Sequence, residues 1–209
     1  MSEFWKTNFR DKNEMWGASP ADAAFDISER FSKYKLNHIL IPGFGYGRNA
    51  IPFLNKGMKV TGIEISRTAI ELAQKRLEND VKIYHDSVSS MPFDEEQYDG
   101  IFCYALIHLL DESERVSLIN NCFNQLSSNG YMIFIALSSN DSRYGKGLEV
   151  KENTFQTKHG INLFFYNIPS IQEEFGKYGL VEFEEINEPT ASKEGKPVEK
   201  FWQIVCKKK

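Results

Sequence analysis

The sequence has few cysteines, no long apolar run and no excess of positive charge. Its 3 cysteines among 209 residues are far apart in apolar stretches, at Cys103, Cys122 and Cys206. This placement predicts reduced core thiols rather than a disulfide or metal framework. No apolar run reaches the roughly 18 residues of a membrane span. Residues 1–5 lack the basic and then apolar pattern of a secretion signal. These absences predict a cytoplasmic protein with no membrane partner.

Charge excludes further classes of protein. The formal net charge is −4, from 25 basic and 29 acidic residues, so nothing in the composition attracts nucleic acid or an anionic membrane. The basic run 207–209 is short, and we interpret it as a solvated tail. His38, His85 and His159 have no metal-ligand spacing with one another or with the cysteines, and we therefore expect no metal. The sequence does not set the oligomeric state.

What the sequence does contain is an alternation of strand and helix patterns. Apolar, strand-like segments occur at residues 38–41, 59–64, 81–85, 98–104 and 131–137, separated by helical patterns at 48–56, 67–78 and 111–126. Ser66 and the pair Asp111 with Glu114 are predicted to begin the second and third helices, and Asn129-Gly130 to end the third. The pattern predicts one α/β domain over residues 1–209, with a doubly wound, mostly parallel sheet. Right-handed crossovers place the first three strands on one side and the next two on the other.

The regular alternation of strand and helix patterns ends after residue 137. Residues 154–157 and 161–166 flank a Gly-containing turn and predict a hairpin, followed by a helix from Ser170, capped with Glu173, to Gly179. Two late strands, 180–186 and 201–206, predict an antiparallel end to the sheet. The polar stretch 138–150, with Arg143, follows the fifth strand at its carboxyl end, where loops shape ligand pockets. Arg143 is a candidate partner for an acidic acceptor, and the alternative is a solvated side chain.

A glycine-rich turn follows the first strand, with Gly43, Gly45 and Gly47 in the pattern Gly-x-Gly-x-Gly. Such glycines let the backbone turn sharply and let a ligand approach closely. Glu64 ends the second strand, where a carboxylate accepts hydrogen bonds from both ribose hydroxyls; the alternative is an exposed strand-end acid. A dinucleotide site has a third glycine where this chain has Arg48, which counts against a pyrophosphate ligand.

Asp86 follows the third strand and is placed to accept a hydrogen bond from an adenine amine, with Val88 offering the ring an apolar face. The alternative is a turn-forming aspartate. No basic cluster is available for a phosphate. The acids therefore favour a cationic, phosphate-free nucleoside such as S-adenosyl-L-methionine over a dinucleotide.

These segments resemble the class I S-adenosylmethionine-dependent methyltransferases over nearly the whole chain. Residues 39–49 resemble their first motif, 60–66 their acidic strand, 86–93 their adenine segment, and the late hairpin their antiparallel seventh strand. The Pro42-Gly43 opening and Trp16-Gly17 resemble the thiopurine and small-thiol branch. The Gly-Arg-Asn tract and the chain end 201–209 resemble the tellurite-resistance type. Many members carry an acid where this chain has Ile41.

The resemblance implies a seven-stranded fold, S-adenosylmethionine as cofactor and a small-molecule methyl acceptor. It implies contacts of the glycine turn with the methionine portion, of Glu64 with ribose, and of residues 104–105 with the methionine and the transferring methyl. The full set of implied cofactor contacts is Trp16, Gly43, Phe44, Gly45, Gly47, Arg48, Asn49, Glu64, Ile65, Asp86, Ser87, Val88, Tyr104 and Ala105.

Methyl transfer from a sulfonium is an in-line displacement, in which the protein contributes mainly alignment. A general base is required only if the acceptor must lose a proton. His108 is our candidate for this base, and the alternative is a packed histidine at a helix start. Tyr104 or Trp16 is the candidate aromatic neighbour for the sulfonium. The aromatic segment 1–35 is a candidate lid, or simply packs on the sheet, and segment 138–168 a candidate acceptor-side insertion.

Three other functions remain open at this point. The first is a nucleoside-binding domain of the same fold that transfers no methyl group. The second is an NAD-dependent oxidoreductase, which the glycine spacing disfavours. The third is a nucleic-acid methyltransferase, which the net charge of −4 disfavours.

Overall fold

The computed structural model describes residues 17–78, 81–192 and 198–209. Its main sheet has seven strands in the order β3-β2-β1-β4-β5-β10-β9. The strands are β1 (His38–Pro42), β2 (Lys59–Glu64), β3 (Lys82–His85), β4 (Tyr98–Tyr104), β5 (Leu126–Leu137), β9 (Leu180–Glu188) and β10 (Glu199–Lys207). Strands β1 to β5 pair in parallel, and β10 is antiparallel to both neighbours. The predicted doubly wound sheet with an antiparallel end is therefore confirmed, as is the placement of its first five strands.

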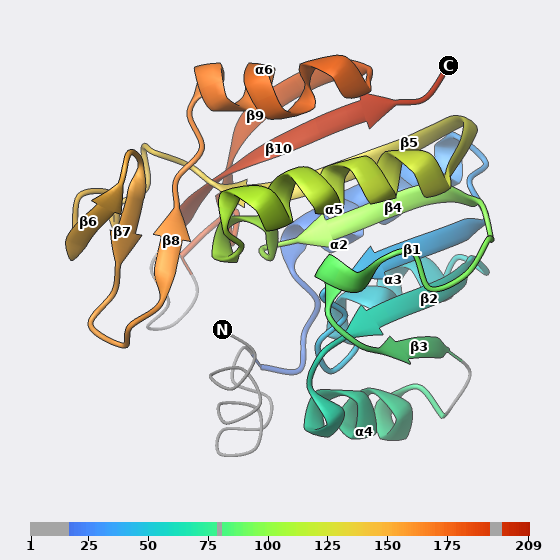
Figure 1. Cartoon of the computed structure of the whole chain (residues 1–209). Helices are drawn as coiled ribbons and strands as arrows, with labels where there is room; N and C mark the ends of the chain where they lie inside the picture. Colours follow the sequence, from blue (N-terminus) through green and yellow to red (C-terminus); the bar gives the residue numbers. More distant parts are fainter. Residues whose placement is uncertain (1–16, 79–80, 193–197) are drawn as a thin grey trace.

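Helices cover both faces of this sheet (Figure 1). One apolar core joins α2 (Asp22–Lys33) and α3 (Ile51–Leu54) to one face, and α4 (Arg67–Arg76) reaches it through Ala73. The other core joins α5 (Glu112–Gln125) and α6 (Ile168–Phe175) to the opposite face. Side chains of β5 alternate between the two cores, with Ile133 in the first and Phe134 in the second, as a doubly covered strand requires.

Short 3₁₀ turns lie where strands meet helices. They are η1 (Arg48–Ala50), η2 (Val88–Ser90), η3 (Ile107–Leu109) and η4 (Gly176–Tyr178). The predicted helix 48–56 is only partly correct, because it splits into η1 and the four-residue α3. Pro52 has no N–H to donate to the carbonyl of Arg48, so a regular helix begins only at Ile51. None of the described helices is long and apolar enough to cross a membrane.

Two helix ends differ from the prediction. Asn129-Gly130 does not end α5; that helix ends at Gln125, and Asn129 adopts a φ of 67° inside β5, where pairing with β4 shifts register. Helix α6 is capped by Asn167, whose side chain accepts from the Ser170 N–H, and not by Ser170 with Glu173. The caps at Ser66 and at Asp111 with Glu114 are confirmed.

A second, three-stranded sheet is built from residues between β5 and α6. Its strands are β6 (Leu148–Lys151), β7 (Thr154–Gln156) and β8 (Asn162–Phe164), so the predicted hairpin 154–166 is present and gains a third strand. All four residues of β6 are exposed, so β6 has no apolar alternation to reveal it. The small sheet lies on the side toward which β1, β2, β4 and β5 point (Figure 1).

The three cysteines are free and buried, as predicted for core thiols. Burial raises the pKa of the Cys103, Cys122 and Cys206 thiols, the last to about 12. The thiolate form is therefore suppressed in all three, and they act as small apolar side chains.

Replacing Gly179 by alanine should destabilise the fold by about 3 kcal/mol, because a left-handed residue with a Cβ costs about 1–2 kcal/mol and the overlap adds to it. Gly179 has a φ of 70°, and a Cβ there would lie 2.2 Å from the Lys207 carbonyl oxygen. Gly57→Ala is the matched control, since Gly57 has a φ of 76° and open space around it. In urea unfolding, Gly57→Ala should lower the free energy of unfolding only by the conformational cost of about 1–2 kcal/mol. An equal loss in the two variants would contradict the prediction.

Candidate active site

The glycine turn Gly43–Gly47 leaves the carboxyl end of β1 and is fastened to the neighbouring strand. Its three glycines have φ values of 71°, 57° and 77°, in the left-handed region that favours glycine. The N–H groups of Gly43 and Phe44 both donate to the Ile63 carbonyl oxygen, at 3.0 and 2.9 Å. Gly43 and Gly45 remain partly exposed. The turn is thus held rigidly with a bare outer surface at the carboxyl edge of the sheet.

Glu64 locks this turn in place from the end of β2. Glu64 is 6% exposed, and its carboxylate oxygens accept from the Gly45 N–H at 2.7 Å and the Ser66 N–H at 2.8 Å. Burial raises the pKa of Glu64, while these two N–H groups oppose that shift. A carboxylate has about four acceptor positions, so each oxygen keeps one for a ligand hydroxyl. The predicted ribose contact is compatible with this geometry and stays a prediction.

Phe44 points away from the predicted ligand position. Its side chain is 5% exposed, and its ring packs so closely on Gly62 of β2 that a Cβ on Gly62 would lie 2.5 Å from it. Only the Phe44 backbone is left for a ligand. Leu106, which sequence reasoning did not select, lies over the turn instead: a Cβ on Gly43 would be 3.0 Å from its side chain.

Arg48 and Asn49, predicted to contact the cofactor, hold the chain that leads into α2. Arg48 Nη1 donates to the Ser19 carbonyl oxygen at 2.8 Å, and Asn49 Oδ1 accepts from the Ala21 N–H at 2.9 Å. Tyr46 and Arg76 hold the preceding carbonyls, those of Gly17 and Ala18, each at 2.9 Å. This segment therefore runs beside the glycine turn. Trp16 and the rest of residues 1–16 of the predicted lid lie outside the described residues.

The predicted adenine-side residues meet at the ends of β2 and β3. Glu64 pairs in register with His85, so Ile65 and Asp86 are the next residues on neighbouring strands. Asp86 is exposed, with Oδ1 accepting from the Ser87 N–H at 2.6 Å. Ser87 caps η2, and Val88 is buried. The structure brings these residues beside Glu64, on the side away from β4.

Tyr104 is the last residue of β4 and Ala105 follows it, on the opposite side of β1 from β2 and β3. The Arg48 guanidinium lies 5.9 Å from the centre of the Tyr104 ring, and the Phe201 ring lies 6.5 Å away with a small tilt. Burial raises the pKa of Tyr104, and the nearby carboxylates of Glu188 and Glu199 act in the same direction. Ala105 has a φ of 51°, unusual for a residue with a Cβ. Strained backbone of this kind clusters at ligand sites.

His108 is buried and neutral. Its Nδ1 accepts from the Leu137 N–H at 3.3 Å, and its ring is 5.9 Å from that of Phe201. Burial lowers the pKa of His108 to about 3, with Arg143 acting in the same direction and Asp141 opposing. The ring lone pair that a base would use is occupied by the backbone. This geometry matches the packed alternative better than a general base.

Polar residues that sequence reasoning did not assign lie around Tyr104. Glu188 accepts from the N–H groups of Asp22 and Ala23 at the start of α2, at 3.0 and 2.9 Å. Glu199 contacts Arg143 Nη1 at 3.0 Å. Glu188 and Glu199 face each other across β9 and β10. Only the long-range pairing of these late strands brings them to the site, so no local sequence signal marks them.

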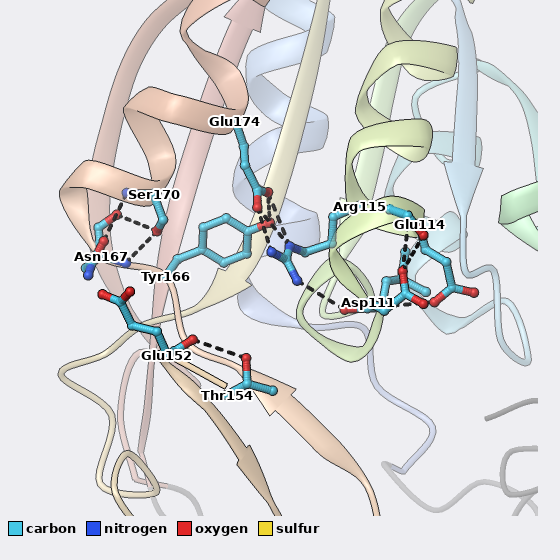
Figure 2. A network of polar contacts seen from close by, with 11 residues as sticks. Asp111, Glu114, Arg115, Glu152, Thr154, Tyr166, Asn167, Ser170 and Glu174 are labelled. Carbon is cyan, nitrogen blue, oxygen red and sulfur yellow. Dashed lines mark hydrogen bonds and ion pairs between the residues drawn. The ribbon is translucent and has the colours of Figure 1, made fainter. Parts of the chain in front are cut away.

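A separate cavity of about 720 Å³ lies on the opposite face, between α5, α6 and the small sheet. Figure 2 shows the polar network beside it, in which Arg115 and Tyr166 both contact the Glu174 carboxylate. None of the predicted cofactor residues lines this cavity. Its charged wall is an internally satisfied ion pair, and the groups suited to a nucleoside lie at the glycine turn.

Part of the chain resembles a known protein family. Residues 39–130, which hold the glycine turn, Glu64 and β4, match a family model described as a methyltransferase domain. The 1,6-didemethyltoxoflavin-N1-methyltransferase of Burkholderia thailandensis, solved with its acceptor and S-adenosylhomocysteine, superposes with a TM-score of 0.73 at 15% identity, over 99% of this chain and 86% of that one. Part of the chain therefore resembles a methyltransferase domain, and the described fold is that of this methyltransferase.

Two further proteins resemble the chain. TehB from Haemophilus influenzae has a TM-score of 0.68 at 17% identity, over 98% of this chain and 67% of that one. An O-methyltransferase of Aspergillus nomiae is 30% identical over 46% of this chain and 44% of its own length. The chain spans about half the length of the curated relatives it matches. The structural likenesses, at these identities, concern the fold.

Proposed function

We propose that the protein transfers the methyl group of S-adenosylmethionine to a small-molecule acceptor at the carboxyl edge of β1, β2 and β4. The observation that carries this proposal is the buried Glu64 carboxylate, which holds the bare Gly45 backbone and keeps acceptor positions for ribose hydroxyls. The bound cofactor supplies an electrophilic methyl group on a sulfonium. The chain's own residues orient it and exclude water.

Two segments are proposed to enclose the acceptor. The chain at residues 17–21 is fixed beside the glycine turn by Tyr46, Arg48 and Asn49, which supports a covering role for the N-terminal segment 1–35. The insertion 138–168 starts at the carboxyl end of β5, next to Tyr104 of β4. A small acceptor would lie between residues 17–21 and the start of the insertion.

Calorimetry with S-adenosylhomocysteine tests the site first, and transfer of a labelled methyl group to small acceptors then tests the activity. Binding with no transfer to any acceptor would favour the non-catalytic nucleoside-binding alternative. Tight binding of NADH with no binding of S-adenosylhomocysteine would favour an oxidoreductase and refute the proposal. The glycine spacing and the Arg48 side chain, committed to Ser19, argue against that second outcome.

Replacing Gly45 by valine should weaken S-adenosylhomocysteine binding at least about tenfold, or about 1.4 kcal/mol. Gly45 has a φ of 57°, where a β-branched residue is strained, and its N–H is held by Glu64. The valine must therefore distort the turn that faces the ligand. Gly160→Val is the control, because Gly160 has a φ of 76° in the distant turn between β7 and β8. Calorimetry showing equal affinity for both variants would place the nucleoside site elsewhere.

A further inference from the structure

The pairing of β4, β5 and β10 brings the Glu199 carboxylate to the side of Tyr104 on which we propose that the acceptor lies. Glu199 begins β10, and Phe201, two residues on, points to the same face of the sheet. The Phe201 ring stacks 6.5 Å from Tyr104, and Phe201 pairs in register with Leu137 at the end of β5. Glu199 therefore lies just beyond the end of β5, at the edge where β4 ends at Tyr104.

The other titratable groups near Tyr104 are occupied. Both Glu188 oxygens accept from the start of α2. Asp141 accepts from Arg143 through one oxygen and from the Lys200 N–H through the other. His108 uses its Nδ1 lone pair for the backbone. Each oxygen of Glu188 and Asp141 and the lone pair of His108 thus already accept from a protein N–H, and proton removal by any of them would compete with that hydrogen bond.

Glu199 differs from them. Its Oε1 contacts Arg143 Nη1 at 3.0 Å, and among the described residues no hydrogen-bond donor reaches its second oxygen. Its side chain is 36% exposed, which leaves that oxygen a route to solvent. Burial raises the pKa of Glu199, and Asp141 acts in the same direction while Arg143 opposes both. A carboxylate with a raised pKa is a stronger base than an ordinary surface acid.

Arg143 adds a hydrogen-bond donor beside this acceptor. Its Nε donates to Asp141 Oδ1 at 2.7 Å and its Nη1 contacts Glu199, while its Nη2 is buried with no hydrogen-bond partner in the described structure. An unpaired buried donor is costly, and a ligand atom that accepts from it removes the cost. Arg143 carries one positive charge, whereas the Asp141 and Glu199 carboxylates that it contacts carry two negative charges. The cluster therefore does not favour an anionic acceptor.

We infer that Glu199 is the general base of the methyl transfer, acting on a neutral acceptor whose nucleophilic nitrogen or oxygen carries a hydrogen, next to an atom that accepts from Arg143 Nη2. The inference rests on the proposed function. As the nucleophile bonds to the methyl carbon, the carbon–sulfur bond breaks and its electron pair stays on sulfur. The acceptor proton passes to the free Glu199 oxygen and then to solvent, which restores the carboxylate.

The test uses the full chain, Glu199→Gln, and two sets of probe acceptors with labelled S-adenosylmethionine. One set holds neutral N–H and O–H compounds, namely catechol, lumazine and xanthine; the other holds thiophenol, 2-mercaptoethanol and tellurite, which react as anions. We expect wild-type methylation within the first set and a loss of at least about 100-fold in kcat for Glu199→Gln. S-adenosylhomocysteine affinity should be unchanged, because Glu199 does not contact the glycine turn. Glu71→Gln, the same charge change on the exposed surface of α4, should behave as wild type.

The pH profile separates a base from a merely structural residue. For wild type, kcat should rise with pH as Glu199 loses its proton, at a pH above the usual carboxylate range because burial raises the pKa of Glu199. The rise should vanish in Glu199→Gln. The charged and titratable groups that act on Glu199 or pair with it in register are Arg143, Asp141, Tyr104 and Glu188. Arg48 and His108 lie farther on, against the Tyr104 and Phe201 rings. Lys200 follows Glu199 on β10 and pairs with Glu185.

The outcomes distinguish this inference from the proposed function. If wild type binds no S-adenosylhomocysteine, the proposed function fails and the inference with it. If it binds but methylates only the anionic set, or methylates neither set, the inference is overturned and the cofactor site stands. Equal kcat values and pH profiles for wild type and Glu199→Gln on an N–H or O–H acceptor also overturn it.

Discussion

Glu64→Ala is expected to weaken S-adenosylhomocysteine binding by at least about a hundredfold. A hydrogen bond to a charged group contributes about 1.5–3 kcal/mol, and the ligand would lose two, one from each ribose hydroxyl. A decade of affinity is about 1.4 kcal/mol, so even the lower value gives about two decades. The variant also leaves the N–H groups of Gly45 and Ser66 without their acceptor, which loosens the turn. Isothermal titration calorimetry measures the loss.

The control for this variant is Glu71→Ala. Glu71 is an exposed acid on α4 that pairs with Arg67. Its replacement by alanine changes the net charge by the same amount as Glu64→Ala without affecting the glycine turn. Its affinity for S-adenosylhomocysteine should match that of wild type. A Glu64→Ala affinity within threefold of the Glu71→Ala value would show that the carboxylate serves only the backbone, and the nucleoside would then need another anchor.

Glu64 also predicts how binding depends on pH. Burial raises the pKa of Glu64 in the free protein. Ribose hydroxyls that donate to the carboxylate favour its charged form, so binding lowers this pKa and releases a proton wherever Glu64 is partly protonated. Affinity should therefore fall as the pH drops through the raised pKa, above the usual carboxylate range. The same titration in two buffers of different ionisation enthalpy measures the proton released.

The parts of the fold that follow from local pattern were predictable from the sequence. Alternating apolar strands and helices favour a parallel sheet. Right-handed crossovers reduce its possible strand orders to a few, and the resemblance to class I methyltransferases selects one of them. The glycine turn and Glu64 were predictable for the same reason, since consecutive strands of such a sheet end at one edge. The register Glu64 with His85 extends this logic to Asp86.

The parts that depend on pairing between distant segments were not predictable. Glu199 meets Arg143 only because β10 inserts between β5 and β9, and the loop after β5 then folds back on it. The inward turn of Phe44 depends on the open space above Gly62. The state of His108 depends on burial against Phe201 and on the Leu137 N–H. None of these contacts can be predicted from the residues next to each position in the sequence.

Arg115→Met should destabilise the protein by about 3–5 kcal/mol, because it leaves a buried carboxylate unpaired. The Arg115 and Glu174 side chains are 7% and 9% exposed. Arg115 Nε and Nη2 contact Glu174 at 2.9 and 2.8 Å, and the guanidinium lies 3.8 Å from the centre of the Phe164 ring. Tyr166 donates to the other Glu174 oxygen at 2.6 Å, as Figure 2 shows. Urea unfolding followed by circular dichroism measures the loss.

Arg67→Met is the matched control, since Arg67 pairs with Glu71 four residues on along α4 and the two side chains are 81% and 62% exposed. Such a pair contributes about 0.3–0.5 kcal/mol, so this variant should unfold within that margin of wild type. The double variant Arg115→Met with Glu174→Leu should recover most of the loss, because an apolar pair needs no counter-charge. If the single Arg115 variant loses less than about 1 kcal/mol, water must reach Glu174 and the two helices do not enclose the pair. The recovery distinguishes a stranded charge from lost packing, because lost packing would persist in the double variant.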